Sequence, residues 1–238
     1  MNRPLPPVLI LAASIALPCA AFAQDRDNAR YDPDRGSPWT FELGGATDNR
    51  SKGASKSGGD PYVFGEVQYN AASGFYADAE FETIDSAGST VETEIEAGWQ
   101  FSGGGFDFDA SVSHKWRVNA DPGQDAAAFE FQFDVIREFG DVDARFRVEH
   151  SPDGLGSTEA WTWVETRVRF PLADRLQGAV MVGRREQDNA PDYTGWSAGV
   201  AYALTEVVEL ELAWHGTDIG DQGAQYEDTL VAAVLFAF

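Results

Sequence analysis

The sequence has one cysteine, Cys19, three histidines, and no apolar run of the length that a membrane-spanning helix needs, which is about 20 residues. Cys19 lies in the predicted leader, so the mature chain would contain no thiol. That excludes disulfides, cysteine nucleophiles and thiolate metal sites. If the mature chain is embedded in a membrane, it must be a β-barrel, because only a closed barrel or a helix satisfies its backbone hydrogen bonds in lipid.

The first residues have the pattern of a secretory leader. Arg3 precedes the apolar run Val8–Leu17, and Ala21–Ala23 reads Ala-Phe-Ala before Gln24. We therefore predict a signal peptide over residues 1–23. A short membrane anchor is the alternative, and the length of the run disfavours it. Residues 24–36 are charged and have no apolar period, which predicts a flexible periplasmic segment.

Basic residues are scarce. The chain has 17 Lys and Arg against 39 Asp and Glu, a net charge of -22. Repulsion from phosphates then argues against a nucleic-acid partner. Acidic chains with few aromatics are often disordered, but this one contains 7 Trp, 7 Tyr and 16 Phe. The composition is that of a folded acidic protein.

The stretch Val91–Phe101, VETEIEAGWQF, shows the organising pattern of the chain. Its apolar and aromatic residues alternate with Glu92, Glu94 and Glu96, which is the period of a β-strand. Three carboxylates on one face cannot lie in a dry core. The pattern indicates either an antiparallel sheet with one wet face or a barrel with lipid outside and water inside.

Similar segments of about ten residues recur from Ser37 onward, giving about twelve strands. In the last segment both faces are apolar, so the sequence does not show which face points into the barrel. Besides Val91–Phe101, the segments are Trp39–Gly44, Val63–Tyr69, Phe75–Glu82, Phe106–Trp116, Phe129–Val135, Val142–Glu149, Trp161–Phe170, Leu176–Gly183, Trp196–Leu204, Val208–His215 and Tyr226–Phe238.

The connections alternate between short and long. Tight turns are predicted at Asn70–Gly74, Ser102–Gly105, Phe139–Asp141, Pro171–Asp174 and Leu204–Val207. Long, solvated links are predicted at Asp48–Asp60, Ile84–Ser89, Arg117–Asp125, Ser151–Ser157, Glu186–Asp192 and Gly216–Gln225. This asymmetry is typical of outer-membrane barrels, whose long loops lie outside the cell.

A secreted two-sheet sandwich or lipocalin-like barrel is the soluble alternative, because it also has one wet face per strand. Charge along whole strands and the terminal aromatic Phe238, which resembles the assembly signal of outer-membrane barrels, weigh against it. We predict an all-β, antiparallel up-and-down transmembrane barrel of about 12 strands over residues 37–238. We expect it in the outer membrane of a Gram-negative bacterium.

Three stretches resemble the TorF family of porins: Gly65–Phe81 (GEVQYNAASGFYADAEF), Thr93–Trp99 (TEIEAGW) and Asp192–Leu204 (DYTGWSAGVAYAL). The resemblance extends over nearly all of the chain from Ser37. The arginine-glycine segment of that family is not clear at Thr47–Lys52, TDNRSK. The resemblance implies an outer-membrane channel.

Twelve tilted strands enclose a backbone radius of roughly 12 Å, so any opening is narrow and suits ions or small solutes. The candidate pore-lining residues separate by charge along the chain. Basic ones gather in the seventh to ninth segments and acidic ones in the third to sixth, with one more acidic residue in the eighth segment and two in the eleventh. They are Arg145, Arg147, Arg167, Arg169 and Arg185, and Asp78, Glu80, Glu82, Glu92, Glu94, Glu96, Asp107, Asp109, Glu130, Asp134, Glu165, Glu209 and Glu211.

Two interpretations of this distribution remain open. One is a transverse field across a constriction, with a cation preference from the acidic excess. The other is a closed network of ion pairs that fills a structural, non-conducting barrel.

Enzymatic chemistry finds little support. His114 and His150 are predicted on the lipid-facing phase, and His215 points inward. Ser113 also points inward, but six strands from His215, so a hydrolase is a remote alternative. We expect no cofactor and no metal, although the loops Asp48–Asp60 and Gly216–Gln225 leave surface binding open. The expected partners are outer-membrane lipid, ions or small solutes, and the barrel assembly machinery through Phe238, while the oligomeric state stays open.

Overall fold

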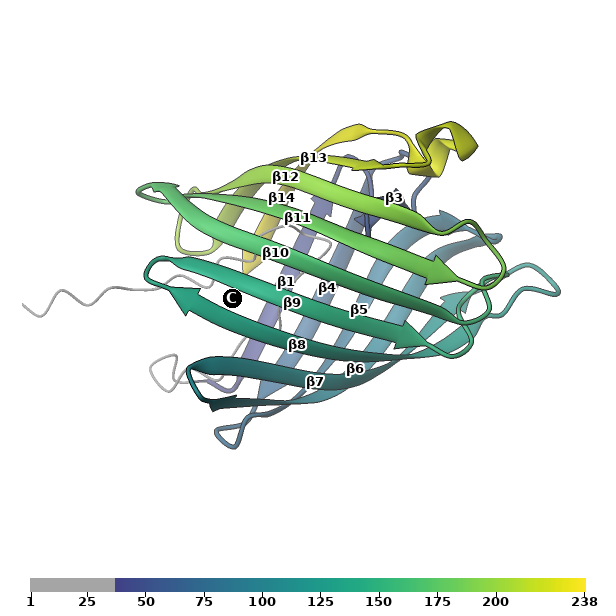
Figure 1. Ribbon diagram of the computed structural model, residues 1–238. Helices are drawn as coiled ribbons and strands as arrows, with labels where there is room; N and C mark the ends of the chain where they lie inside the picture. The colour runs from purple at the N-terminus through teal and green to yellow at the C-terminus, as the bar shows by residue number, and fades with distance from the viewer. Residues whose placement is uncertain (1–36) are drawn as a thin grey trace, which may run out of the picture.

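Twelve strands close into one antiparallel barrel in a computed structural model that describes residues 37–238. Each strand pairs with its neighbours along the chain (Figure 1). The predicted signal peptide and the segment 24–36 lie outside the described residues. The barrel strands are β1 (Trp39–Ala46), β4 (Tyr62–Asn70), β5 (Phe75–Ser86), β6 (Ser89–Gly103), β7 (Phe106–Val118), β8 (Ala127–Phe139), β9 (Val142–Ser151), β10 (Trp161–Ala173), β11 (Leu176–Gln187), β12 (Tyr193–Ala203), β13 (Val208–Thr217) and β14 (Thr229–Ala237).

The period-two pattern decides which side chains face in. On β6, Glu92 is 3 % exposed on the inner wall, whereas Ile95 is 53 % exposed on the outer face. Alternate residues of a strand point to opposite sides of a sheet, so this phase carries through the whole strand. The prediction of a closed antiparallel barrel of about 12 strands is confirmed.

Pairing of β1 with β14 closes the ring. Phe238 donates its backbone N–H to the Phe41 carbonyl at 2.9 Å, and Phe41 donates to the Phe238 carbonyl at 3.2 Å. The phase of β14, which the sequence left open, places Val231 and Leu235 inside and Leu230 and Phe236 outside. Closure matters because an open edge would present unpaired backbone groups.

The two ends of the barrel differ in their connections, and we name them the short-turn end and the long-loop end (Figure 1). One predicted long link is wrong. Strands β5 and β6 extend further than expected and pair at Ser86 and Ser89, so only a two-residue turn joins them. Ala87 and Gly88 have φ values of 51° and 76°, the left-handed geometry of tight hairpin turns. Strand β7 likewise includes Arg117, which the sequence pattern assigns to a loop.

Large apolar side chains cover the outer face. A continuous surface of this kind marks contact with lipid or another apolar partner, because a soluble monomer rarely exposes it. No helix within residues 37–238 is long and apolar enough to cross a membrane. Aromatic residues of this surface near the short-turn end include Trp39, Phe41, Phe75, Trp99, Phe101, Phe139 and Phe238.

The link between β1 and β4 folds into the barrel mouth. It contains a small hairpin, β2 (Arg50–Ser51) and β3 (Ala54–Ser55). Arg50 is buried and donates to Asp48 and to the Thr229 hydroxyl of β14. The prediction of a solvated loop at Asp48–Asp60 is therefore wrong for most of its length, because its polar side chains find partners inside the barrel.

Glycines allow the hairpin to reach the opposite wall. A Cβ on Gly53 would lie 2.8 Å from the Gly216 carbonyl oxygen, and a Cβ on Gly195 would lie 2.3 Å from the Lys52 carbonyl oxygen. A side chain at Gly53 would collide with the wall backbone, and one at Gly195 would collide with the hairpin backbone. Gly195 and Gly216 thus form a cradle for the hairpin tip, Lys52–Gly53.

Candidate functional site

A row of carboxylates crosses three neighbouring strands of the inner wall. Glu66 of β4 pairs in register with Glu80 of β5, and Glu80 pairs with Glu94 of β6. Asp78 and Glu96 form a second pair one step nearer the short-turn end. Like charges directly opposite one another on adjacent strands disfavour the sheet. We name this acidic surface, Glu66 to Glu96 on β4–β6, the acidic wall.

Arginines gather on the other side of the ring. Arg145 of β9 pairs in register with Arg167 of β10, and Glu165 accepts from Arg145, both of that ion pair being 0 % exposed. Arg167 lies 3.8 Å from the same carboxylate, and Arg169 lies 3.2 Å from Asp143. We name this surface the arginine wall. In the order of twelve strands, β10 lies opposite β4, so the acidic and arginine walls face each other.

The two charge groups also meet where β8 adjoins β9. Arg147 donates to both oxygens of Asp134, at 2.8 and 2.7 Å. A bidentate arginine–carboxylate pair is among the strongest ionic contacts available. The structure thus contains both arrangements that the charge distribution suggested. The acidic and arginine walls face each other across the bore, and acidic and basic side chains form ion pairs where β8 adjoins β9.

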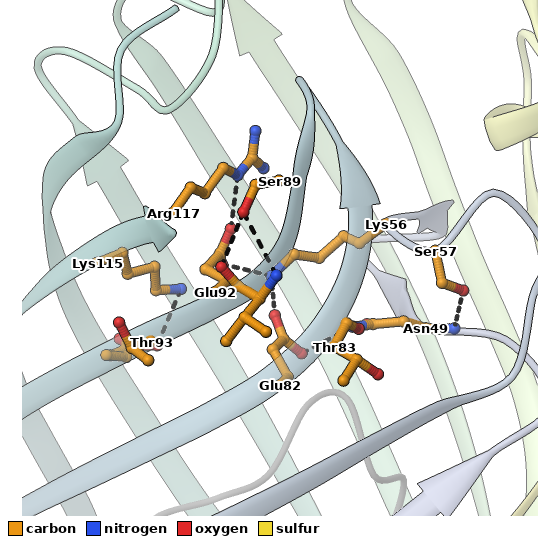
Figure 2. A network of polar contacts seen from close by, with 12 residues as sticks. Asn49, Lys56, Ser57, Glu82, Thr83, Ser89, Glu92, Thr93, Lys115 and Arg117 are labelled. Carbon is orange, nitrogen blue, oxygen red and sulfur yellow. Dashed lines mark hydrogen bonds and ion pairs between the residues drawn. The ribbon is translucent and has the colours of Figure 1, made fainter. Parts of the chain in front are cut away.

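Lysines of the first link bind carboxylates at the long-loop end. Lys56, which follows β3, contacts Glu82 of β5 and lies 2.6 Å from Glu92 of β6 (Figure 2). Arg117 of β7 reaches the same Glu92 at 2.9 Å. Burial opposes the charged ammonium, yet the carboxylates of Glu82 and Glu92 outweigh it and raise the pKa of Lys56 above its usual range. Lys56 therefore stays charged and fixes the link against β5 and β6.

Two further pairs complete this end. Lys52 lies 2.7 Å from Glu149 of β9. Lys115 of β7 lies 2.8 Å from Glu130 and 3.3 Å from Glu94, so it joins β8 to the acidic wall. The interior at this level is a network of paired charges that the β2–β3 hairpin helps to assemble.

Above this network a cavity of about 530 Å³ opens at the long-loop end. We name it the vestibule. Trp161, Tyr193 and Tyr226 contribute aromatic surface, and its acidic side chains are Glu92, Asp121 and Glu130. Its basic side chains outnumber the acidic ones and are Lys52, Lys56, Lys115, Arg117 and Arg185.

The structure places the sequence-predicted candidates on the inner side of their strands. Sequence reasoning missed Lys52, Lys56 and Glu149, the first two because they lie in a link predicted to be solvated. The buried members of the predicted set are Glu92, Asp109, Glu130, Asp134, Arg145, Arg147, Glu165, Arg167 and Glu211, and the partly buried ones are Asp78, Glu80, Glu82, Glu94, Glu96, Asp107, Arg169, Arg185 and Glu209.

The hydrolase alternative gains nothing from the geometry. Ser113 and His215 both face inward, but β7 and β13 lie opposite each other in the ring. His114 packs against Trp116 and Phe129, and His150 is exposed. Within residues 37–238 no group of three or more His, Cys, Asp or Glu is arranged to hold a metal ion.

Taken together, a closed twelve-stranded barrel with an apolar outside and a charged inside defines a porin-type fold. The chain belongs to the Gcw_chp family, described as bacterial protein of unknown function, whose model matches residues 32–237. The TorF resemblance is not shown by this match. No curated protein matches the chain.

Solved structures of similar fold include porins. The KdgM porin has a TM-score of 0.57 at 7 % identity, over 84 % of this chain and 99 % of that one. The NanC porin has a TM-score of 0.58 at 10 % identity, over 82 % and 98 %. One KdgM structure, with a TM-score of 0.57 at 8 % identity over 84 % and 99 %, is a complex with disordered oligogalacturonate. At such identities the likeness shows the fold.

Proposed function

We propose that the protein is an outer-membrane channel through which ions and small hydrophilic solutes diffuse passively, with a preference for cations. The observation that carries this proposal is the opposition of the acidic wall to the arginine wall inside a barrel whose outer face is apolar. The fold shared with KdgM and NanC supports it. In this account residues 1–23 are a signal peptide, the long-loop end faces the outside of the cell, and Phe238 serves assembly.

The cation preference rests on the excess of carboxylates. Glu66, Glu80 and Glu94 lie side by side on adjacent strands, and carboxylates outnumber basic groups among the candidate pore-lining residues. Fixed charges of one sign raise the local concentration of the opposite ion. The net field of the interior therefore favours cations.

A non-conducting barrel is the second candidate, and a specific observation favours it. Trp163, Phe64 and Tyr76 are fully buried inside the barrel, and the indole of Trp163 donates to Glu165 of a buried ion pair. Bulky side chains and closed pairs reduce the space that water can occupy. The opening is accordingly narrow, and the two candidates differ in whether solute passes.

Liposome swelling separates the candidates. Purified mature protein is refolded into vesicles, its closure is checked by heat-modifiable migration, and influx is followed for a series of uncharged solutes. We expect small polyols to enter and larger sugars to be excluded, since a twelve-stranded bore is narrower than those of 16–18 strands. Folded protein that admits none of the solutes would support the non-conducting barrel.

A further inference from the structure

Arg185 differs from the other basic residues of the vestibule. Lys52, Lys56, Lys115 and Arg117 each form an ion pair with a carboxylate. Among residues 37–238, Arg185 forms none, and its Nε is buried without a hydrogen-bond partner. The side chain is half-buried and lines the vestibule, so its guanidinium presents a positive charge that no ion pair within residues 37–238 offsets.

Aromatic rings hold this guanidinium in place. Arg185 lies on β11 between Trp163 of β10 and Tyr193 of β12 in register. Its Cζ lies 4.3 Å from the centroid of the Trp161 ring, and Lys52 Nζ lies 4.9 Å from the same ring. Cations over an indole are attracted to its face, which fixes them without neutralising their charge. The result is a preorganised positive site next to the open vestibule.

The rest of the vestibule does not neutralise Arg185. Its buried carboxylates are already engaged, Glu92 by Lys56 and Arg117, and Glu130 by Lys115. Asp121 is exposed at the rim. The cavity of about 530 Å³ is within the range of roughly 300–1,000 Å³ that small-molecule sites occupy.

The polar groups around the site suit a hydroxylated ligand. Gln124, Gln187 and Thr158 line the same cavity and offer hydrogen-bonding groups, and Tyr226 adds aromatic surface. Carboxylates are the anions that an arginine fork binds bidentately. A ligand that combines one carboxylate with several hydroxyls would use both features.

We propose that the vestibule binds small hydroxylated carboxylates, such as sugar acids, with the carboxylate on Arg185 and beside Lys52. This inference rests on the proposed function, because it names a solute class that the channel mouth captures. It concerns the mouth alone. The carboxylates deeper in the bore set the preference among small ions, and a ligand held at Arg185 occludes the path for those ions.

The test compares D-glucuronate with D-glucose in single-channel recordings. Glucuronate added on the long-loop side is expected to interrupt the current in a concentration-dependent manner, and glucose at the same concentrations is not. The R185Q variant should bind glucuronate at least about tenfold more weakly, since it loses a charge-assisted contact. R184Q is the matched control: Arg184 is the adjacent residue on the same strand, but it faces outward and its side chain is 46 % exposed.

Calorimetric titration of the folded, detergent-solubilised barrel provides a second readout that does not need conductance. Binding of glucuronate that R185Q weakens and R184Q preserves supports the site even if the barrel carries no current, an outcome that would contradict only the proposed channel. Equal effects of glucuronate and glucose, or full binding by folded R185Q, would overturn the inference while leaving the channel intact.

Discussion

Lys52 Nζ lies 2.7 Å from Glu149 Oε1, and both side chains are only 9 % exposed. Lys52 belongs to the hairpin that follows β1, and Glu149 belongs to β9, which lies opposite β1 in the ring. The ion pair therefore bridges the bore at the long-loop end. The width of the bore is limited here by a folded link as well as by the strands.

The glycine cradle offers a direct way to move this link. In G195V the new side chain would meet the Lys52 carbonyl, so the hairpin must shift away from β12. We expect a loss of stability of about 1–3 kcal/mol from overpacking. Single-channel conductance should rise, because the narrowest segment dominates the resistance.

G103V is the control for that variant. Gly103 lies at the short-turn end of β6, and a Cβ at this position would meet no atom within 4 Å beyond its chain neighbours. Its conductance should equal that of the unaltered protein. A G195V barrel that folds with unchanged conductance would show that the hairpin does not define the constriction.

The contact of Lys56 with the acidic residues predicts a definite pH response. Burial alone would lower the pKa of Lys56 in the folded state. The carboxylates of Glu82 and Glu92 outweigh this effect, so the folded-state pKa is raised. A raised pKa contributes its full stability at any pH below the pKa of the unfolded state, which is about 10.4 for lysine. That contribution is lost only as the pH rises through the higher pKa of the folded state. Resistance of the link to proteinase K should thus stay constant from about pH 7 to about pH 10. K56Q should be cleaved faster throughout, and a cleavage rate of the unaltered protein that climbs between about pH 8 and pH 9 would contradict this.

The buried pair of the arginine wall should be sensitive to the loss of one partner. R145M leaves Glu165 with the Trp163 indole N–H at 2.8 Å and with Arg167 at 3.8 Å. We expect the free energy of unfolding to fall by about 3 kcal/mol, the usual scale for removing one partner of a buried ion pair. Urea unfolding followed by tryptophan fluorescence measures it.

The double variant R145M/E165M removes both charges and should recover at least half of that loss, because apolar pairs replace buried ion pairs at little cost. If the single and double variants were equally unstable, packing rather than charge would explain the effect.

The outer face gives a test of membrane contact. Ile95 lies in the middle of β6 and is 53 % exposed. In I95R, an arginine at the bilayer midplane should lower stability in lipid vesicles by about 2–4 kcal/mol. V91R, on the same outer face of β6 but near the long-loop end, should lower it by about 1 kcal/mol or less. Equal losses for the two variants would argue against a bilayer around β6.

Local periodicity was enough to predict the barrel and the direction of its side chains. The alternation of apolar and acidic residues in Val91–Phe101 involves only neighbours along one strand, so it can be recognised from the sequence alone. The inward fold of the first link could not be predicted in that way, since it depends on Gly195 and Gly216, more than a hundred residues away. In the sequence those glycines look like ordinary strand residues. Only the structure shows that Gly53 of the hairpin packs against them. Likewise, that Arg185 forms no ion pair within residues 37–238 is a property of the assembled vestibule.

The central claim is that the two charged walls line a conducting, cation-preferring path. Single-channel currents across a KCl gradient test it most directly. We predict discrete current steps whose reversal potential has the sign for K⁺ permeation, and a shift toward zero in E66Q/E80Q/E94Q. Folded, heat-modifiable barrels that carry no current, or that show an anion preference, would contradict the account.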